Sequence, residues 1–412
     1  MMQRDAIILG AGAAGLLCAL TARRRGFSCL VLDHGPVAGR KLRLAGGGKG
    51  NVTNLTIAPD WYVGEHPAFP EAVLRRCPTA FVLDLLRSFA IDYEIREYGQ
   101  VFCTVQAARL VEALTQACSD AVEPSNGASD SSTDTDTLFN RDLGEITHAD
   151  GLFTVRTSDE VVQAPRLVIA TGSPAWPKAG ATDAGMRLAR QWGHKVIPVR
   201  PVLVPLVFPE TWPLHGLAGV SLPAKVSTLA PSSADSAGRM RAFSYPLLFT
   251  HKGLSGPAIL QASCFWRSGQ ALHVDFLPDQ SALDLMHQPE NGKFTVLGLF
   301  RKLLPSRLAE RLISPELATR KVAQLRKKDR EALALALHDH TVIPTRTEGM
   351  GKAEAAAGGV DTTDINPRTL ESRNRPGLYL IGEVLDVTGL LGGYNLHWAW
   401  ASAKACAEGW KK

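Results

Sequence analysis

Residues 6–20 read AIILGAGAAGLLCAL, and this stretch predicts the fold of the first part of the chain. The apolar run Ala6 to Leu9 predicts a buried strand. The glycines at 10, 12 and 15 that follow it form a G-x-G-x-x-G motif, and Leu16 to Arg25 has the composition of a helix. A strand, a glycine-rich turn and a helix in this order are typical of a dinucleotide-binding α/β domain.

Each glycine of the motif has its own physical reason. Gly10 permits the tight turn, Gly12 lets the backbone approach a pyrophosphate, and Gly15 lets the helix pack close to the strand. The first turn of the helix offers free N–H groups to phosphate. A second apolar run, Phe27 to Leu32, ends at Asp33, which is placed to accept hydrogen bonds from a ribose diol. The alternative is a glycine-rich turn that only packs helix on strand.

The chain contains no second G-x-G-x-x-G motif. A reductase that binds two dinucleotides in two Rossmann domains would be expected to carry another one in mid-chain. We therefore expect one tightly held dinucleotide, with NADH or NADPH as a transient electron donor.

The stretch RLAGGGKGNVTN, residues 43–54, resembles a phosphate-binding loop but does not match one. Gly50 stands where that motif needs Ser or Thr, and Arg43 stands where it needs its first glycine. The stretch follows Asp33 closely, so we expect it to lie beside the cofactor, where glycines allow close approach of the backbone. Positive charge would come from Arg40, Lys41 and Lys49, and amide hydrogen bonds from Asn51 and Asn54. The alternative is a flexible surface loop.

Two later segments also have the pattern of cofactor contacts. The apolar run Leu167 to Ala170 leads into Thr171-Gly172, a strand followed by A-T-G that recurs in FAD enzymes. Near the end, the run Leu378 to Ile381 leads into Gly382-Glu383. The segment Gly392-Gly393-Tyr394-Asn395 then opens a final helix, whose positive end we expect to face the flavin.

Composition limits the class of protein. The length of 412 residues suggests two or three domains, and 45% hydrophobic residues suffice for a packed core. The seven cysteines form no C-x-x-C pair, which favours reduced, buried thiols in a cytoplasmic protein. No apolar run reaches the length of a membrane span, and Arg23, Arg24 and Arg25 follow the first apolar stretch where a signal peptide would have its cleavage site. Pro124 to Thr137 has almost no apolar residue, which predicts a disordered loop or the tip of a hairpin.

The middle of the chain has a different texture. Proline-punctuated β-like runs begin near residue 195, and a helical stretch follows at about 281–338. Residues 293–330 carry eleven Lys and Arg against three Asp and Glu, a net +8 that exceeds the +5 of the whole chain. We favour a solvated helix face, because no aromatic residues alternate with the charges; the alternative is docking to nucleic acid or another polyanion.

Taken together, these segments resemble a known family, the BaiN-like flavoproteins, also called aminoacetone-oxidase-type FAD-binding enzymes. The matching segments span nearly the full length in the same order. They are GAGAAG, GRKLRLAGGGKGNVTN, IATGSPAWPKAGATDAG, THKGLSGPAIL, LLPSRLAERLI and AGGVDTTDINPRTLESRNRPGLYLIGEVLDVTGLLGGYNLHWAW.

The resemblance implies an α/β protein with a Rossmann-like FAD-binding domain in two pieces, 1–193 and 346–412. A β-rich domain, 194–345, would be inserted with a small helical subdomain at about 281–338. The family implies FAD-dependent oxidoreductase chemistry on a small molecule that the sequence does not identify. The alternatives are a flavoprotein that docks to RNA through residues 293–330 and a non-enzymatic flavin redox sensor.

The sequence departs from the family at three places. Gly50 replaces the usual cysteine, His397 replaces a glutamine, and Ser402-Ala403 replaces Ser-Gly. A catalytic cysteine at position 50 is therefore excluded, and we expect the substitution Gly50→Cys to leave FAD binding intact.

No metal site is expected, and no catalytic acid or base is assigned; His251, Lys252, Tyr394 and His397 are weak candidates. The residues expected to contact FAD are Gly10, Gly12, Ala13, Ala14, Gly15, Asp33, His34, Gly39, Arg40, Lys41, Gly48, Asn51, Asn54, Ala170, Thr171, Gly172, Gly382, Glu383, Asp386, Gly393, Tyr394, Asn395 and Leu396.

Overall fold

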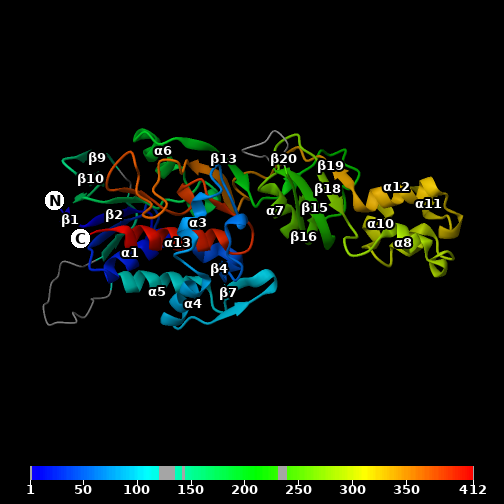
Figure 1. The fold of residues 1–412 in the computed structure, drawn as a ribbon, viewed down its shortest axis with the longest axis horizontal. Helices are drawn as coiled ribbons and strands as arrows, with labels where there is room; N and C mark the ends of the chain where they lie inside the picture. Colours follow the sequence, from blue (N-terminus) through cyan, green and yellow to red (C-terminus); the bar gives the residue numbers. More distant parts are fainter. Residues whose placement is uncertain (1, 120–134, 142–143, 231–238, 412) are drawn as a thin grey trace. The chain divides into compact units, whose positions relative to one another are not determined.

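The two ends of the chain fold together, and the middle forms a unit of its own (Figure 1). A computed structural model describes residues 2–119, 135–141, 144–230 and 239–411. The first unit combines Met1–Arg200 with Ala355–Lys412, and the second is Pro201–Glu354. The sequence placed these boundaries at 193 and 345. They lie further along the chain because β13 (Val196–Val202) pairs with β21 (Ala355–Val360).

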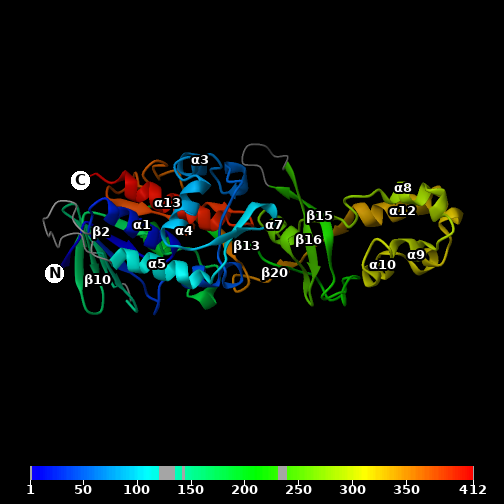
Figure 2. The ribbon, with the colours of Figure 1, turned by 90° about the horizontal axis from the view of Figure 1, so that it is seen from below.

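A five-stranded parallel sheet forms the core of the first unit. Four of its strands are apolar and fully buried, as expected for a parallel sheet with both faces covered. The helices α1 (Ala13–Arg24), α13 (Tyr394–Gly409) and α5 (Ala107–Ser119) pack beside one another along it (Figure 2). The strand order is β22 (Leu378–Leu380), β12 (Leu167–Ile169), β2 (Ala6–Leu9), β3 (Cys29–Leu32) and β8 (Thr135–Leu138).

The predicted strand–turn–helix unit is confirmed, with one correction. Helix α1 begins at Ala13 and so includes Gly15, whereas the sequence suggested a start at Leu16. The reason is that the motif itself supplies the first turn. A side chain at Gly10 would lie 2.5 Å from the carbonyl oxygen of Ala170, and one at Gly15 would collide with the carbonyl of Gly10. At Gly12 no heavy atom lies within 4 Å.

The stretch 43–54 is not a flexible loop. Helix α2 (Arg40–Leu44) leads into a 3-10 turn, η1 (Ala45–Gly48), and then into β4 (Asn51–Asn54). Strand β4 pairs with β7 (Gln100–Cys103), which explains why the segment is ordered. Of the predicted loop 124–137, residues 124–134 lie outside the described residues, whereas Thr135–Thr137 belong to β8 because they pair with β3.

Smaller elements complete the first unit. A four-stranded sheet contains β1 (Met2–Gln3), β11 (Val161–Ala164), β10 (Leu152–Arg156) and β9 (Ile146–Ala149), and β6 (Tyr93–Ile95) joins β7 and β4. Strand β5 (Tyr62–Val63) pairs with β23 (Thr388–Gly389). The remaining helices are α3 (Phe69–Leu74), α4 (Thr79–Ser88) and α6 (Ala184–Gln191).

The second unit is an antiparallel sheet with a helical part. The sheet order is β19 (His340–Val342), β18 (Leu272–Asp275), β15 (Ser221–Ala230), β16 (Arg239–Phe249), β17 (Gly253–Ser255), β14 (Leu206–Val207) and β20 (Arg346–Thr347), and α7 (Pro257–Ser263) packs on β15 and β16. The helical part contains α8 (Ala282–His287), α9 (Val296–Phe300), α10 (Ser306–Leu312), α11 (Pro315–Ala318) and α12 (Lys327–His338).

Two further observations concern the whole of the described chain. All seven cysteines are buried and unbridged. Among the described residues, no helix is both long enough and apolar enough to cross a membrane.

The different surroundings of Gly15 and Gly12 give a stability prediction. Gly15→Ala forces the start of α1 away from β2, and overpacking of this kind costs about 2 kcal/mol of unfolding free energy. Gly12→Ala, with open space and φ of −81°, should cost much less. Thermal unfolding of the cofactor-free protein measures both. Equal midpoints for the two variants would contradict the assignment of Gly15 to packing.

Candidate functional site

The segments predicted to contact a dinucleotide meet at one edge of the parallel sheet. Gly10–Gly15 follow β2, Asp33 and His34 follow β3, Ala170–Gly172 follow β12, and Gly382–Glu383 follow β22. Because these four strands are parallel and adjacent, their carboxyl ends lie at the same edge. In open α/β sheets this edge is where ligands bind.

Asp33 holds the glycine turn in place. One carboxylate oxygen accepts a hydrogen bond from the Ala11 backbone N–H at 2.8 Å, and the other accepts one from Gly35 N–H at 2.7 Å. The Arg40 guanidinium lies 3.3 Å from the same carboxylate, and its Nη2 is 3.0 Å from the His34 ring. A carboxylate has further lone pairs, so Asp33 keeps the capacity to accept from a ribose. Gly39, whose N–H donates to Ala11, caps α2 with a left-handed φ of 64°.

Glu383 joins three segments of the chain. Its carboxylate accepts from the Lys41 ammonium at 2.7 Å and from the Ser173 hydroxyl at 3.1 Å. Lys41 lies in α2, Ser173 directly follows Thr171-Gly172, and Glu383 follows β22. The sequence predicted Lys41 and Glu383 separately but missed their contact and missed Ser173. The position of Ser173 next to the A-T-G pattern is the feature of the sequence from which it could have been predicted.

The fit of a dinucleotide rests on three observations within the described residues. The first turn of α1 carries no side-chain cap and no acidic residue, so its N–H groups are available to phosphate. No heavy atom lies within 4 Å of the point where a side chain would start at Gly12 or at Gly172. The Asp33 carboxylate lies beside the glycine turn and keeps lone pairs for a ribose, whereas the buried Thr171 hydroxyl lies against Gly185 of α6. The residues present therefore fit a dinucleotide such as FAD.

Two predicted asparagines form hydrogen bonds with the backbone, and any contact of theirs with FAD stays a prediction. The Asn54 amide donates to the carbonyls of Gly392 and Tyr98 at 2.9 and 3.0 Å, and its oxygen accepts from Thr56. The Asn395 amide forms two 2.8 Å hydrogen bonds with the backbone of Gly389. Both amides are therefore committed to the turn that precedes α13. The side chain of Asn51 contacts that of Gln100 at 2.7 Å.

The start of α13 remains a candidate ligand contact. Gly393 caps the helix in a left-handed conformation without a side-chain cap, and Leu396 lies in the first turn. Tyr394 is buried and stacks on Trp61, which the sequence did not single out, with ring centroids 5.5 Å apart. The Tyr394 hydroxyl lies 3.1 Å from that of Thr56.

The glycines of the 3-10 turn adopt conformations that favour glycine. Gly46, Gly47 and Gly48 have φ of 58°, 68° and 88°, and Gly50 has φ of 65°. A side chain at Gly50 would lie 3.0 Å from the Ala107 methyl group. A cysteine there would therefore be strained, so we expect Gly50→Cys to make the turn less stable. The expectation that this substitution leaves FAD binding intact stays a prediction.

His397 is fully buried and structural. Its ring nitrogens contact the Thr53 hydroxyl at 2.7 Å and the Cys77 carbonyl at 2.9 Å. Burial lowers the pKa of His397 to about 4, although the hydrogen bond to Cys77 opposes the change. A ring with no exposed surface does not reach a substrate, so His397 is not a catalytic acid or base. The other two candidates, His251 and Lys252, are exposed in the turn between β16 and β17 of the second unit and stay predictions.

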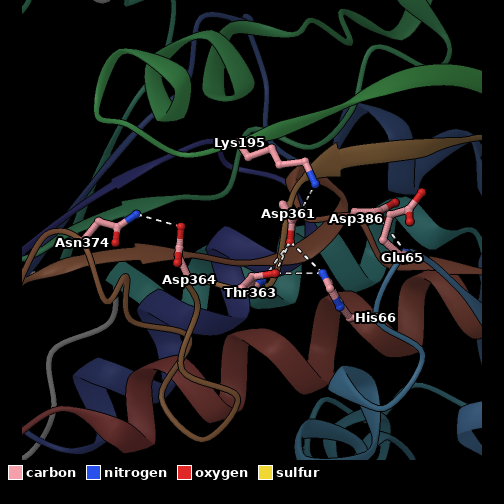
Figure 3. A network of polar contacts seen from close by, with 8 residues as sticks. All are labelled: Glu65, His66, Lys195, Asp361, Thr363, Asp364, Asn374 and Asp386. Carbon is pink, nitrogen blue, oxygen red and sulfur yellow. Dashed lines mark hydrogen bonds and ion pairs between the residues drawn. The ribbon is translucent and has the colours of Figure 1, made fainter. Parts of the chain in front are cut away.

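A polar network that the sequence did not predict surrounds Asp361 (Figure 3). Its buried carboxylate contacts Lys195 Nζ at 2.9 Å, His66 Nε2 at 3.0 Å and the Thr363 hydroxyl at 2.7 Å. Burial alone would raise the pKa of Asp361, but the hydrogen bonds from Lys195 and Thr363 outweigh it and hold the pKa below its usual range. The network thus connects three segments of the chain: the one before β13, the one after β5 and the one after β21.

Asp386, a predicted FAD contact, lies beside this network. Its carboxylate accepts from the backbone N–H groups of Glu65 at 2.8 Å and Gly358 at 3.1 Å. Burial raises the pKa of Asp386, and the two backbone hydrogen bonds only partly offset this. Both carboxylate oxygens thus contact the protein's own backbone, so any contact of Asp386 with FAD stays a prediction.

The pKa of His397 generates a pH prediction. In the folded chain it is about 4, below the ordinary 6.5, so the unfolded chain takes up a proton first as pH falls. The stabilising contribution of neutral His397 is complete above pH 6.5 and is lost progressively towards pH 4. Its upper limit is about 3 kcal/mol. The unfolding free energy of His397→Gln should therefore fall less steeply over this window than that of the wild type.

Denaturant titrations of the cofactor-free protein across these pH values measure the slope. His287→Gln is the matched control, because His287 is exposed and should leave the slope unchanged. If the unfolding free energies of His397→Gln and the wild type fall with the same slope, the assignment of His397 as a buried neutral histidine is contradicted.

Three relatives and one family model match the chain over nearly its whole length. The family model described as "HI0933-like protein Rossmann domain" matches residues 4–409. The chain is 37% identical to "Ribosomal RNA dihydrouridine synthase" of Escherichia coli, covering 99% of this chain and 98% of that protein. A protein of the same name in Haemophilus influenzae is 37% identical over 97% of both chains.

A third relative, "3-dehydro-bile acid delta(4,6)-reductase" of Clostridium scindens, is 31% identical, covering 97% of this chain and 98% of that protein. The strand–glycine turn–helix unit, the parallel sheet and these full-length matches agree. The chain belongs to the HI0933-like family of Rossmann-domain proteins, which confirms its resemblance to the BaiN-like flavoproteins.

Proposed function

We propose that this protein is an FAD-dependent reductase of carbon–carbon double bonds conjugated to a carbonyl group, and that its substrate is a uridine in ribosomal RNA. The observation that carries the proposal is the 37% identity, over 99% of the chain, to a relative named for dihydrouridine in ribosomal RNA. Dihydrouridine is uridine with two hydrogens added across C5=C6, a bond conjugated to the C4 carbonyl. The relative named for a bile acid Δ(4,6)-reductase supports the same reaction class.

The residues at the carboxyl ends of the parallel strands support FAD as the redox group. The pyrophosphate would lie on the first turn of α1, at Gly12 to Ala14, and Asp33 would accept from the adenosine ribose. The flavin would lie against Thr171, Gly172 and the Glu383 junction, at the carboxyl ends of the parallel strands. When bound, the flavin would be reduced by NADH or NADPH, and the reduced flavin would supply the hydride.

The chain itself has to orient the uracil and deliver a proton. Addition of hydride to C6 places negative charge on the C4 oxygen and on C5, so a donor must reach C5. The uncapped N-terminus of α13 would favour negative charge on a group that faces it. Since all seven cysteines are buried, we assign no thiol as the donor. His251 and Lys252, both exposed, stay the candidates.

A small conjugated enone is the second candidate substrate. It is favoured by the 31% identity to the bile acid reductase, and the cofactor chemistry would be the same. The third alternative, a flavin redox sensor, predicts that the bound flavin is reduced and reoxidised without turning over any substrate.

One anaerobic experiment separates the three. Purified protein should carry FAD, and NADH or NADPH should bleach its visible absorption. Reduced protein is then mixed with untreated ribosomal RNA, with a transcript of the same sequence in which dihydrouridine already replaces uridine, or with a panel of enones. The proposal predicts that untreated RNA reoxidises the flavin and gains dihydrouridine, detected by mass spectrometry of its nucleosides.

Each other outcome contradicts the proposal in a different way. Reoxidation by an enone but not by RNA would identify a small-molecule reductase. Reoxidation by neither would favour the sensor. Protein that takes up no FAD would overturn the flavin assignment altogether.

A further inference from the structure

The helical part of the second unit carries an unusually exposed set of cations. Of the eleven Lys and Arg between residues 293 and 330, all except Arg330 are exposed. They lie on α9 to α12 and the turns between them, which gather at one end of the second unit (Figures 1 and 2). The sequence favoured an ordinary solvated face because aromatic residues do not alternate with these charges.

Several of these cations already have partners. Arg301 pairs with Glu310, Arg326 with Asp329, and Lys327 lies 3.9 Å from Glu331. Arg307 donates to the carbonyls of Gly216 and Ala218. These contacts lower the net charge that the partnered side chains offer to an incoming anion.

Three lysines differ, because two of them lie over an aromatic ring and the third lies on the neighbouring segment. The ammonium of Lys302 lies 3.4 Å from the centroid of the Phe294 ring, and that of Lys293 lies 5.5 Å from it. Lys321 lies on the neighbouring segment, where it forms a β-bridge with Thr295 and where Val322 N–H donates to the Phe294 carbonyl. All three lysines are exposed and Phe294 is half-buried.

Nothing in the described part of the chain neutralises this cluster. None of the three ammonium groups forms an ion pair with a carboxylate there. Glu290, the acidic residue nearest to Lys293 in the sequence, forms no ion pair with it. The ring of Phe294 orders the Lys302 ammonium by cation–π attraction, so the charge is held at a fixed place without being cancelled.

We propose that Lys293, Phe294, Lys302 and Lys321, the Phe294 cluster, bind the phosphate backbone of RNA. Clustered ammonium groups without acidic partners are what a phosphate backbone attracts, and an aromatic ring among them is typical of surfaces that bind nucleic acid. The inference rests on the proposed function and adds where its RNA substrate would be held. It gives the second unit a part in holding RNA that is separate from the redox chemistry of the first.

The test compares two sets of substitutions in full-length, flavin-loaded protein. The cluster variant carries Lys293→Gln, Lys302→Gln and Lys321→Gln. The matched control carries Arg301→Gln, Lys327→Gln and Lys225→Gln, which remove the same charge from exposed positions outside the cluster. Binding of a fluorescent fragment of ribosomal RNA is measured over a series of salt concentrations.

The cluster variant should bind RNA at least tenfold more weakly at low salt. The slope of log K against log salt should become shallower by about 2 to 3, because each lysine would contact one phosphate. In the control the slope should change by less than about 1. Both variants should unfold at the wild-type temperature, and NADH or NADPH should reduce their flavin at the wild-type rate.

Equal losses of affinity in the two variants would overturn the cluster and indicate diffuse attraction. Wild-type affinity in the cluster variant, or no binding of RNA by the wild type at low salt, would overturn it as well. The proposed function fails separately, if RNA binds through the cluster yet never reoxidises the reduced flavin.

Discussion

The contact of the Glu383 carboxylate with Lys41 and Ser173 is the interaction on which the candidate site depends. It joins the helix after the second core strand along the chain, the turn after the fourth and the turn after the last, and Glu383 lies 342 residues from Lys41 and 210 from Ser173 in sequence. Parallel pairing brings their carboxyl ends to one edge, and the ion pair then fixes their side chains. Since its three partners are only partly exposed, the pair is less screened by solvent than a surface ion pair.

The local parts of this arrangement could be predicted from the sequence, and the assembled parts could not. The strands around Gly10, Thr171 and Gly382 follow from apolar runs and glycines a few residues apart. Ser173 and Trp61 acquire their roles only from partners far along the chain. The Asp361 network is the extreme case, because its members come from residues near 66, 195 and 361 and form no motif.

Side-chain direction was the second limit. Asn54 and Asn395 lie in glycine-rich stretches, and the sequence therefore predicted that they contact the cofactor. In the structure their side-chain amides form hydrogen bonds with backbone carbonyls and N–H groups. His397 shows the same lesson, because the sequence cannot say which face of α13 is buried. Polar residues at a ligand-binding turn often build the turn, since buried backbone groups need partners as much as ligands do. The basic helices show the reverse: Phe294 follows Lys293 in the sequence, but only the structure shows that the Lys302 ammonium lies over its ring.

The most direct test of this account is the crystal structure of the protein as purified, with its flavin. We predict that the pyrophosphate lies on the N–H groups of Gly12 to Ala14. The flavin ring should lie against Gly172 and the Glu383 junction. A flavin bound away from the carboxyl ends of these strands, or a pyrophosphate away from the first turn of α1, would contradict the account.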